Sequence, residues 1–395
     1  MRINLPHPNE FAKIWEEVTG VALNKTVRGI VTDSREVRPG DLYIAISGDR
    51  VDGHTFIKDV FEKGAVCALI NSEIENADEQ LIKVNNSVST IGKVAKAWRN
   101  QFDIPVMGIT GSNGKTSTKE LLKHMLSAQF NIHATEGNFN TSIGLPLTLL
   151  RLTKENTMSI LEMGANQPGD IAQLCEIAQP THGVITNIAP AHLEGFGTIE
   201  AVAKTKGELF ACLAKGVSFI NAADYRVGAL EILGDAISFG LTPECDYPAD
   251  IHHEKDGTIT LTVDTEEIPT HSVNLTFAKN VIACAAIVRT LGLSWDKIRE
   301  NVASFQPPKG RCEVKNNGMI TIIDDTYNAN LESTVAAIDY LKAFSGNGQR
   351  IFVFGDMFEL GDLSQDQHRR VGEKCNEAEL SAVFTVGEET VTTDA

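Results

Sequence analysis

The segment Thr110-Gly111-Ser112-Asn113-Gly114-Lys115-Thr116 decides how the rest of this sequence is interpreted. It lies between residues 105–110 and 115–127, whose apolar patterns predict a strand and an amphipathic helix. Glycines let backbone N–H groups turn inward, and a helix N-terminus adds positive potential, so the segment suits phosphate oxygens. A glycine-rich turn with a solvated lysine is the alternative, but the strand before and the helix after favour a phosphate-binding loop.

This loop is a shorter form of the Walker pattern, because Ile109 stands where that pattern has its first glycine. In such a loop Lys115 reaches the outer phosphates and the Thr116 hydroxyl binds Mg²⁺. We therefore predict a nucleoside triphosphate site with Mg²⁺. Its residues in this segment are Gly111, Ser112, Asn113, Gly114, Lys115, Thr116 and Ser117.

Strand–loop–helix units continue on both sides of the loop. Apolar runs at 158–163 and 183–188 are each followed by a loop and a helix. This alternation predicts an α/β fold with a mostly parallel sheet covered on both faces. A polar hairpin, with its turn at Asp256-Gly257, is expected at the end of this part.

Three domains are predicted, at residues 1–101, 102–307 and 308–395. Short strands at 27–31, 42–46 and 66–70 indicate a small N-terminal α/β unit, and Gln306-Pro307-Pro308-Lys309-Gly310 is the best linker. The third domain is expected to have three parallel strands, at 319–323, 350–354 and 382–386. Three strands are few for such a sheet, so we expect this domain to be incomplete.

Composition narrows the class of protein. The chain has 395 residues, 42% hydrophobic and 22% charged, with a net charge of −17. This charge opposes bulk attraction to nucleic acid or anionic lipid, so we expect neither as a partner. No apolar run is long enough to span a membrane, and the N-terminus lacks a signal-peptide core. Seven scattered cysteines without a CxxC pair predict buried thiols, hence a cytoplasmic protein, expected to be a monomer.

Three further residues follow predicted strands or lie on the next helix. Glu162 ends the run 158–163, and a carboxylate at the carboxyl edge of a parallel sheet lies where ligands bind. His192 also follows a strand, and Lys206 is on the helix 199–213. Alone, each has an ordinary interpretation as a solvated or structural residue, which for Lys206 is the better one from spacing, since Lys204 stands beside it. Together with Lys115, Glu162 and His192 favour a functional role.

Several polar clusters are compatible either with a ligand or with ordinary turns, because Asn, Asp and Gly are common turn residues. The first of these clusters offers hydroxyl, guanidinium and backbone N–H donors, which suit a phosphate-bearing ligand. It comprises Ser34, Arg35, Gly48, Asp52, Gly53 and His54. The others are the loop 137–141, with Asn138, Asn140 and Thr141, and the segment 324–330, with Asp325, Asn328 and Asn330.

These motifs, in this order, resemble the Mur ligase family. The resemblance rests on six segments: 111–116, 136–148, 162–166, 186–195, 206–208 and 327–330. It implies an N-terminal domain for a UDP-sugar, a central P-loop ATPase and a C-terminal Rossmann-like domain that closes over the site. The implied activity joins D-Ala-D-Ala to UDP-MurNAc-tripeptide, both small molecules, through an acyl phosphate made with ATP.

The resemblance also implies residue roles. It makes Lys115, His192 and Lys206 catalytic, with Lys206 carbamylated by CO₂ to support a second Mg²⁺. Metal ligands would be Thr116, Glu162, His192 and Lys206, and further nucleotide contacts Asn280, Arg311, Asp325 and Asn328. The UDP-substrate side would include Ser34, Arg35, Gly48, Asp52, Gly53 and His54, with Asn138, Asn140 and Thr141 nearby. The chain departs from the family pattern at Ala283, where a second Asn is expected to touch adenine, and mildly at Thr141 and Leu331.

Alternatives remain open. A sister ligase adding a single amino acid is the nearest, although the Asp-Asn-Pro-Arg motif of one sister is not found in this sequence. A non-catalytic nucleotide-binding relative is another. A GTPase switch would need Asn-Lys-x-Asp after the loop, but Asn24-Lys25 precedes it and lacks the Asp.

Overall fold

The computed structural model describes residues 1–48, 51–74, 80–344 and 348–394, so positions 49–50 of the predicted segment 48–54 lie outside the described residues. The chain forms two compact units. The first comprises Met1–Gly108, Phe130–Gly164 and Asp170–Thr181, and the second Ile109–Gln129, Ala165–Gly169 and His182–Ala395. Both are built from helices and mostly parallel strands, which confirms the predicted α/β class.

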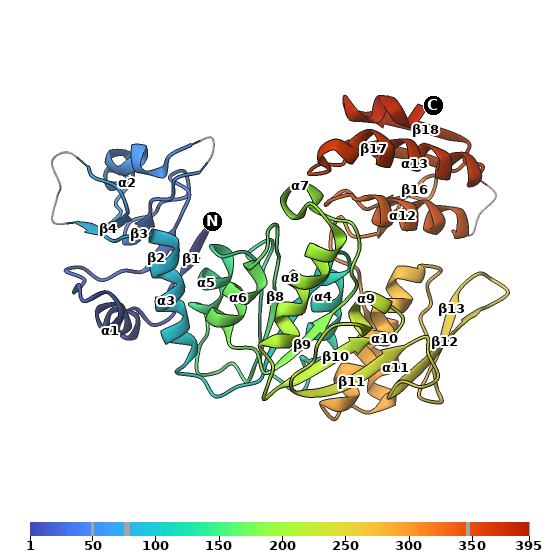
Figure 1. Ribbon diagram of the computed structural model, residues 1–395, viewed down its shortest axis with the longest axis horizontal. Coiled ribbons are helices and arrows are strands. Elements are labelled where there is room, and N and C mark those ends of the chain that lie inside the picture. Colours follow the sequence, from blue (N-terminus) through green and yellow to red (C-terminus); the bar gives the residue numbers. More distant parts are fainter. Residues whose placement is uncertain (49–50, 75–79, 345–347, 395) are drawn as a thin grey trace. The chain divides into compact units, whose positions relative to one another are not determined.

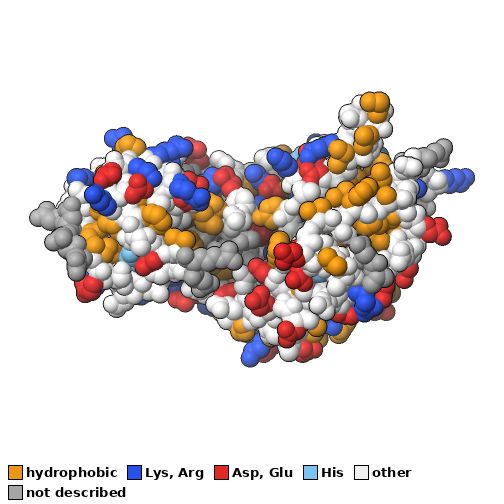
Figure 2. Space-filling view, turned by 90° about the horizontal axis from the view of Figure 1, so that it is seen from above, with side chains coloured by type: hydrophobic (Ala, Val, Ile, Leu, Met, Phe, Trp, Pro, Cys, Tyr) orange, Lys and Arg blue, Asp and Glu red, His pale blue; other side chains and the backbone are white. Residues whose placement is uncertain are grey.

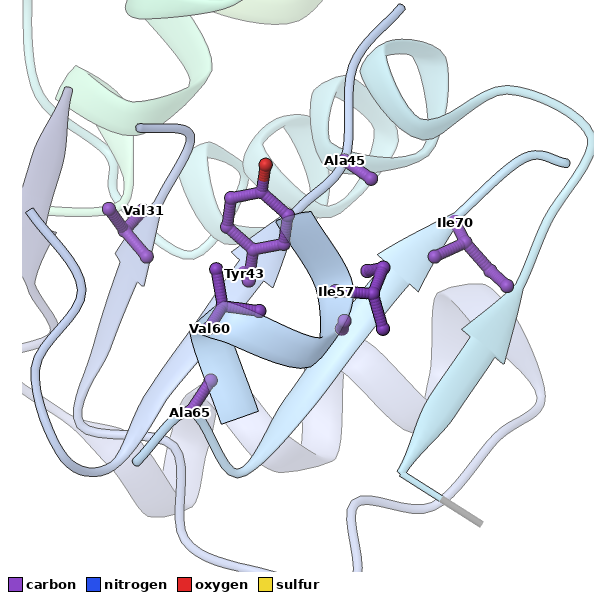
Figure 3. Packing of buried hydrophobic residues seen from close by; sticks show 8 residues of the cluster. Val31, Tyr43, Ala45, Ile57, Val60, Ala65 and Ile70 are labelled. Carbon is purple, nitrogen blue, oxygen red and sulfur yellow. The ribbon is translucent and has the colours of Figure 1, made fainter. Parts of the chain in front are cut away.

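The first unit begins with a five-stranded sheet in the order β1-β2-β3-β4-β5, of which Figure 1 labels the first four strands. Its strands are β1 (Arg2–Asn4), β2 (Gly29–Val31), β3 (Asp41–Ile44), β4 (Cys67–Ile70) and β5 (Leu81–Lys83). Only β1 is antiparallel to its neighbour. The side chains of Ile57 and Val60, from helix α2 (Ile57–Glu62), pack with Tyr43 in the core of this sheet (Figure 3). The strands predicted at 27–31, 42–46 and 66–70 are therefore confirmed.

The same unit contains a second set of elements. Helix α1 (Pro8–Thr19) packs against α3 (Ser87–Arg99), which also contacts α5 (Gly144–Leu149) and α6 (Asp170–Ala178). Strands β7 (Ile132–Ala134) and β8 (Met158–Glu162) pair in parallel. The whole of β8 is buried, as its continuous apolar run predicts for a strand covered on both faces.

His133, on β7, is a buried histidine held by two hydrogen bonds. The carbonyl of Thr148 lies 2.9 Å from Nε2, and because a carbonyl only accepts, Nε2 carries the proton. Nδ1 then accepts from the Ser159 hydroxyl at 2.8 Å. Burial lowers the pKa of His133 from its usual value to about 4, so the folded protein holds it neutral.

We expect this histidine to make the protein sensitive to mild acid. In the unfolded chain it takes a proton near pH 6.5, whereas in the folded protein it does so only near pH 4. The unfolded state therefore binds more protons in this window, and stability falls as the pH drops through it, by about 3 kcal/mol in total. Urea unfolding of His133→Gln between pH 7 and 4 should show a shallower loss than the wild type. Equal slopes would contradict the prediction.

The second unit contains strands in the order β14-β13-β12-β11-β10-β9. Strands β9 (His182–Ile185), β10 (Val217–Asn221), β11 (Asp235–Gly240) and β12 (Tyr247–His253) run in parallel, and β13 (Ile259–Val263) and β14 (Glu266–Pro269) complete it antiparallel. The predicted hairpin turn is confirmed, with Gly257 at φ 86°. Strand β6 (Val106–Thr110) leads into α4 (Lys115–Leu126), and further helices are α8 (Ile199–Ala211), α10 (Leu275–Thr290) and α11 (Trp295–Ser304).

The C-terminal strands differ from the prediction of one sheet with three parallel strands. β15 (Glu313–Asn316) and β16 (Thr321–Asp324) form an antiparallel pair, and β17 (Ile351–Gly355) and β18 (Ala382–Val386) a separate parallel pair. The short turn at Gly318, φ 87°, returns the chain directly from β15 to β16. Helices α12 (Leu331–Ala343) and α13 (Ser364–Glu377) accompany them. Val353, Phe384 and Val386 are more than half exposed, and Figure 2 shows hydrophobic side chains gathered on this part of the molecule.

Two other expectations can be compared with the structure. In the described ranges, no helix combines the length and the hydropathy needed to cross a bilayer. Within those ranges the seven cysteines form no disulfide, and Cys67, Cys175, Cys284 and Cys375 are buried. Cys212 is exposed, so the prediction of buried thiols is wrong for it. Cys212 is the C-cap residue of α8, and residue type alone did not predict that it is exposed there.

Candidate active site

The phosphate loop is shaped by two glycines that other residues could not replace without strain. Gly111 has φ 149°, and a Cβ there would lie 1.9 Å from the Thr186 hydroxyl oxygen. Gly114, at φ 81°, is the N-cap of α4, and its Cβ position lies 3.1 Å from Oδ1 of Asn280. Asn280, on α10, thus lies against the loop, where the sequence predicted a nucleotide contact.

Hydrogen bonds to the segment after β9 hold the loop in this form. Asn187 accepts from the N–H of Ser112 through its carbonyl and from the N–H of Asn113 through its side chain, each at 3.0 Å. The Ser112 hydroxyl donates to the carbonyl of Ala189 at 2.8 Å and accepts from the Ala189 N–H at 2.9 Å. These bonds fix the first half of the loop. Phosphate oxygens would then bind at the N-terminus of α4.

Lys115 places its ammonium group within this loop. Nζ donates to the carbonyls of Gly111, at 2.7 Å, and Ser112, at 3.3 Å. The cation is therefore held by the loop's own backbone, beside the N-terminus of α4, where the helix dipole also favours an anion.

Lys206 is buried on α8, with 2% of its surface exposed. Burial and, second, the nearby charge of Lys115 lower its pKa well below the usual value for lysine. Lys204, two residues earlier, is exposed. The structure thus separates two lysines that sequence alone could not, and it brings Lys206 near Lys115. An amine kept neutral in this way can act as a nucleophile.

His192 begins a short helix, α7 (Leu193–Phe196), with its backbone in the left-handed region at φ 53°. Its Nδ1 contacts a carboxylate oxygen of Glu359. In addition, the N–H of Glu194 points to the carbonyl of Glu359 at 3.4 Å. Sequence analysis missed Glu359, because no local pattern connects residues 167 positions apart.

Residues after the predicted linker also reach the loop. Arg311 donates from Nη2 to the Thr116 hydroxyl at 3.1 Å, and its guanidinium lies 3.9 Å from the Tyr327 ring centre. The buried Nε of Arg311 has no hydrogen-bond partner among the described residues. Asn330 donates to the side chain of Asn113 at 2.6 Å. Arg311 is thereby joined to Thr116, and Asn330 to Asn113.

Glu332 is a second residue that sequence analysis missed. Its carboxylate accepts from the side-chain amide of Asn113 at 3.4 Å, and burial raises its pKa. The only signal for it was its place two residues after Asn330, which caps helix α12.

Two predicted nucleotide contacts have different surroundings. Asp325 is partly buried and accepts from the N–H of Cys312 at 3.0 Å, and burial raises its pKa. Asn328 is exposed, and its side chain accepts from the N–H of Ala329 at 2.9 Å. Of these residues and Arg311, it is Arg311 that makes a hydrogen bond to the phosphate loop in the part of the chain that the structure describes.

In the first unit, Glu162 ends strand β8 as a buried carboxylate. Asn140 donates to it at 2.9 Å through its side-chain amide. A Cβ on Gly164 would lie 3.2 Å from that amide, so glycine gives Asn140 room. The structure therefore joins two predicted residues, a metal ligand and a substrate contact, in one pair. The Thr141 hydroxyl instead accepts from the Gly144 N–H at 3.4 Å, and Asn138 is exposed.

The predicted phosphate-binding cluster near Ser34 has its own internal partners. Arg35 pairs with Asp33 at 2.6 Å, and these hydrogen bonds hold the pKa of Asp33 well below its usual range. The Arg35 side chain is 86% exposed, so a phosphate group could reach it only in competition with Asp33. The carbonyl of Ser34 accepts from Lys63 at 2.9 Å.

Asp52 and His54 form a closed hydrogen-bond pair. His54 Nε2 accepts from the N–H of Asn71 at 3.2 Å, so Nδ1 carries the proton that is donated to Asp52 at 2.6 Å. A Cβ on Gly53 would lie 2.8 Å from the Ile46 nitrogen, which explains the glycine. Gly48 donates from its N–H to the carbonyl of Val51 at 3.0 Å. These residues shape the loop, and both ring nitrogens of His54 are engaged in hydrogen bonds, one to Asp52 within the loop and one to Asn71 outside it.

The donor set fits a hard cation only in part. Among the described residues no group of three His, Cys, Asp or Glu side chains could hold a metal by itself. The carboxylate of Glu162 and the hydroxyl of Thr116 are ligand types that Mg²⁺ prefers, whereas the imidazole of His192 is not.

Comparison with known proteins gives three family matches and many relatives. Residues 26–99 match "Mur ligase family, catalytic domain", residues 109–288 "Mur ligase middle domain", and residues 310–395 "Mur ligase, glutamate ligase domain". The UDP-N-acetylmuramoyl-tripeptide–D-alanyl-D-alanine ligase of Escherichia coli is 35% identical, over 92% of this chain and 82% of that protein. The protein of the same name from Synechocystis is 34% identical, over 93% and 81%.

Solved structures are also similar to this chain over most of its length. MurF from Acinetobacter baumannii has a TM-score of 0.86 at 29% identity, covering 97% of this chain and 86% of that one. MurF ligase from Thermotoga maritima, in complex with ADP, has a TM-score of 0.81 at 32% identity, covering 92% and 86%.

Proposed function

Because the chain belongs to the Mur ligase family, we propose that it joins D-alanyl-D-alanine to UDP-N-acetylmuramoyl-tripeptide in the synthesis of peptidoglycan precursors. ATP is the co-substrate and is converted to ADP and phosphate. The observation that carries this proposal is the arrangement of the phosphate loop, with Lys115 held on its carbonyls and the buried amine of Lys206 beside it. The enzyme would act in the cytoplasm as a monomer.

We assign the work to three parts of the chain. Residues 1–101 would bind the UDP-substrate, residues 102–307 ATP, and residues 308–395 would close over the nucleotide. The substrate contacts proposed in the first unit are Ser34, Arg35, Gly48, Asp52, Gly53, His54, Asn138, Asn140 and Thr141. Of these, Arg35 offers an exposed guanidinium and Asn140 an amide hydrogen-bonded to Glu162.

In the first step, a carboxylate oxygen of the tripeptide attacks the γ-phosphorus of ATP, and ADP leaves. Negative charge gathers on the transferred phosphoryl group and on the leaving oxygen. Lys115 and the amides at the start of α4 would stabilise that charge. The unpartnered Nε of Arg311 supports a further contact with the phosphates, since a buried donor needs an acceptor.

In the second step, the amine of D-alanyl-D-alanine attacks the carbonyl carbon of the acyl phosphate. Phosphate then leaves from the tetrahedral intermediate, and the amine loses a proton. Holding both substrates in contact removes much of the entropic barrier, up to about 7–11 kcal/mol in ideal cases. Asn280 would help to fix the nucleotide from its place against Gly114, with Asp325 and Asn328 as further contacts.

We further propose Mg²⁺ ligation by Thr116, Glu162, His192 and Lys206. When bound, the ion neutralises phosphate charge and polarises the oxygen atoms that react. Lys206 lacks an oxygen, but a neutral amine can add CO₂ to give a carbamate anion and a proton. Its lowered pKa supports this chemistry, because only the neutral amine reacts with CO₂. The resulting carbamate would supply the type of oxygen ligand that a hard cation prefers.

The proposal is tested by measuring phosphate release with Mg-ATP, UDP-MurNAc-tripeptide and D-Ala-D-Ala, omitting each in turn. Release should require all three. A parallel series replaces the dipeptide with single amino acids and the tripeptide with its dipeptide precursor. Activity only in that series would identify a sister ligase, and ATP binding without any substrate-dependent release would identify a non-catalytic relative.

A further inference from the structure

Glu359 lies in a loop, residues 355–361, at the end of strand β17. Hydrogen bonds to other C-terminal residues hold this loop in place. The N–H of Met357 donates to Nε2 of the buried His368 at 3.0 Å. Asp356 accepts from the N–H groups of Glu389, at 3.1 Å, and Thr390, at 3.0 Å. Met357 itself is 2% exposed. The loop therefore has a fixed form that sets the position of Glu359.

The same loop meets the segment around His192 at two groups. The Glu359 carboxylate contacts Nδ1 of His192, and the Glu359 carbonyl faces the N–H of Glu194 at 3.4 Å. The Cβ position of Gly361 lies 4.0 Å from the Cα of Glu194. A side chain and a backbone group of one residue thus both engage this segment.

Both partners adopt an unfavourable backbone conformation to do so. His192 has φ 53° and Glu359 has φ 63°, in the left-handed region, which is uncommon for residues other than glycine and less favoured by glutamate than by histidine. Such a conformation persists only where the surroundings determine it, which is often at functional sites. Glycine or asparagine would relieve the strain at position 359 but would not reach the imidazole as glutamate does.

The contact determines which nitrogen of His192 is available. A carboxylate only accepts hydrogen bonds, so Nδ1 of a neutral His192 must carry the proton, and Nε2 keeps its lone pair. Metal-binding histidines commonly have this arrangement, in which a carboxylate on one nitrogen orients the ring and strengthens the other as a ligand.

We infer that Glu359 is a positioning residue for His192: it fixes the Nδ1–H tautomer and presents Nε2 to a divalent cation. This inference rests on the metal-binding role proposed for His192. The contact between Glu359 and His192 would also couple metal binding to docking of the loop. A metal ion on Nε2 makes Nδ1–H a stronger donor, so binding of the ion and docking of the loop 355–361 favour each other.

Three variants separate this role from a structural one. Glu359→Asn shortens the side chain but suits the left-handed backbone, so the loop keeps its form. Glu359→Gln keeps the length and an accepting oxygen but removes the charge. Asp362→Asn is the matched control, because Asp362 is an exposed carboxylate three residues further along the chain.

The first readout is the ¹⁵N chemical shifts of the His192 ring, assigned with the His192→Gln variant. The wild type, Glu359→Gln and Asp362→Asn should show the Nδ1–H tautomer, and Glu359→Asn should shift towards Nε2–H. The second readout is Mn²⁺ affinity in the presence of ADP, by electron paramagnetic resonance. Glu359→Asn should bind Mn²⁺ about tenfold more weakly or worse, and Asp362→Asn like the wild type.

An unchanged tautomer and unchanged Mn²⁺ affinity in Glu359→Asn would overturn the inference. His192→Gln distinguishes the two levels of the argument. If His192→Gln weakens Mn²⁺ binding while Glu359→Asn does not, only the role of Glu359 fails. If His192→Gln itself leaves Mn²⁺ binding unchanged, the proposed metal role of His192 fails.

Discussion

Replacing Lys115 by alanine is expected to lower turnover by about a thousandfold or more. The ammonium group is held by the carbonyls of Gly111 and Ser112 at the start of helix α4, so it is in place before charge develops on the phosphoryl group. Removing one such preorganised donor typically costs 10²–10³ in rate, and Lys115 carries a full charge as well. Steady-state phosphate release, with ATP affinity measured separately, gives the size of the effect.

Lys123→Ala is the control for this change, because Lys123 is exposed on the same helix. It should keep near wild-type activity and thermal stability. Substantial ligation by Lys115→Ala would refute the assignment of the phosphate loop. A loss confined to ATP affinity, with turnover retained at saturation, would show that Lys115 binds the nucleotide but does not stabilise the transition state.

Replacing Lys206 by alanine is expected to reduce turnover at least a hundredfold. The buried amine cannot be a solvated surface group, and its lowered pKa leaves it able to add CO₂ and become an anion. Alanine removes both the amine and the carbamate. Depleting CO₂ and bicarbonate from the assay should lower wild-type activity, and adding bicarbonate should restore it.

Lys204→Ala provides the matched control, since Lys204 is two residues away and exposed. It should remain within about twofold of the wild type, as is usual for a surface substitution. If Lys206→Ala retains activity, or if the wild type is indifferent to CO₂, Lys206 has only a structural role. A folded Lys206→Ala protein, checked by circular dichroism, is required for either conclusion.

The fold could be predicted from sequence where periodicity and glycine placement agree. The buried strand β8 and the amphipathic helix α4 gave clear patterns, and the predicted strand at 382–386 matches β18. The C-terminal sheet could not be predicted, because pairing depends on where strands meet in space. Nothing in the apolar run at 319–323 indicates that it returns antiparallel to β15.

The residues of the candidate site also fall into those that the sequence could predict and those that required the structure. The loop from Gly111 to Thr116 was recognisable because its chemistry is local, whereas Glu359 and Glu332 contact His192 and Asn113 across long stretches of chain. The distinction between Lys204 and Lys206 also required the structure. Burial of Lys206, and hence its lowered pKa, cannot be deduced from the neighbouring residues in the sequence.

The central claim, that this chain activates a carboxylate as an acyl phosphate, is tested most directly with ¹⁸O. UDP-MurNAc-tripeptide labelled on both oxygens of its reacting carboxylate would be turned over with ATP and D-Ala-D-Ala, and the products weighed by mass spectrometry. One ¹⁸O should appear in each phosphate released, and the other should remain in the new amide. Unlabelled phosphate would mean that water, not the carboxylate, attacks ATP, and would contradict the proposed reaction.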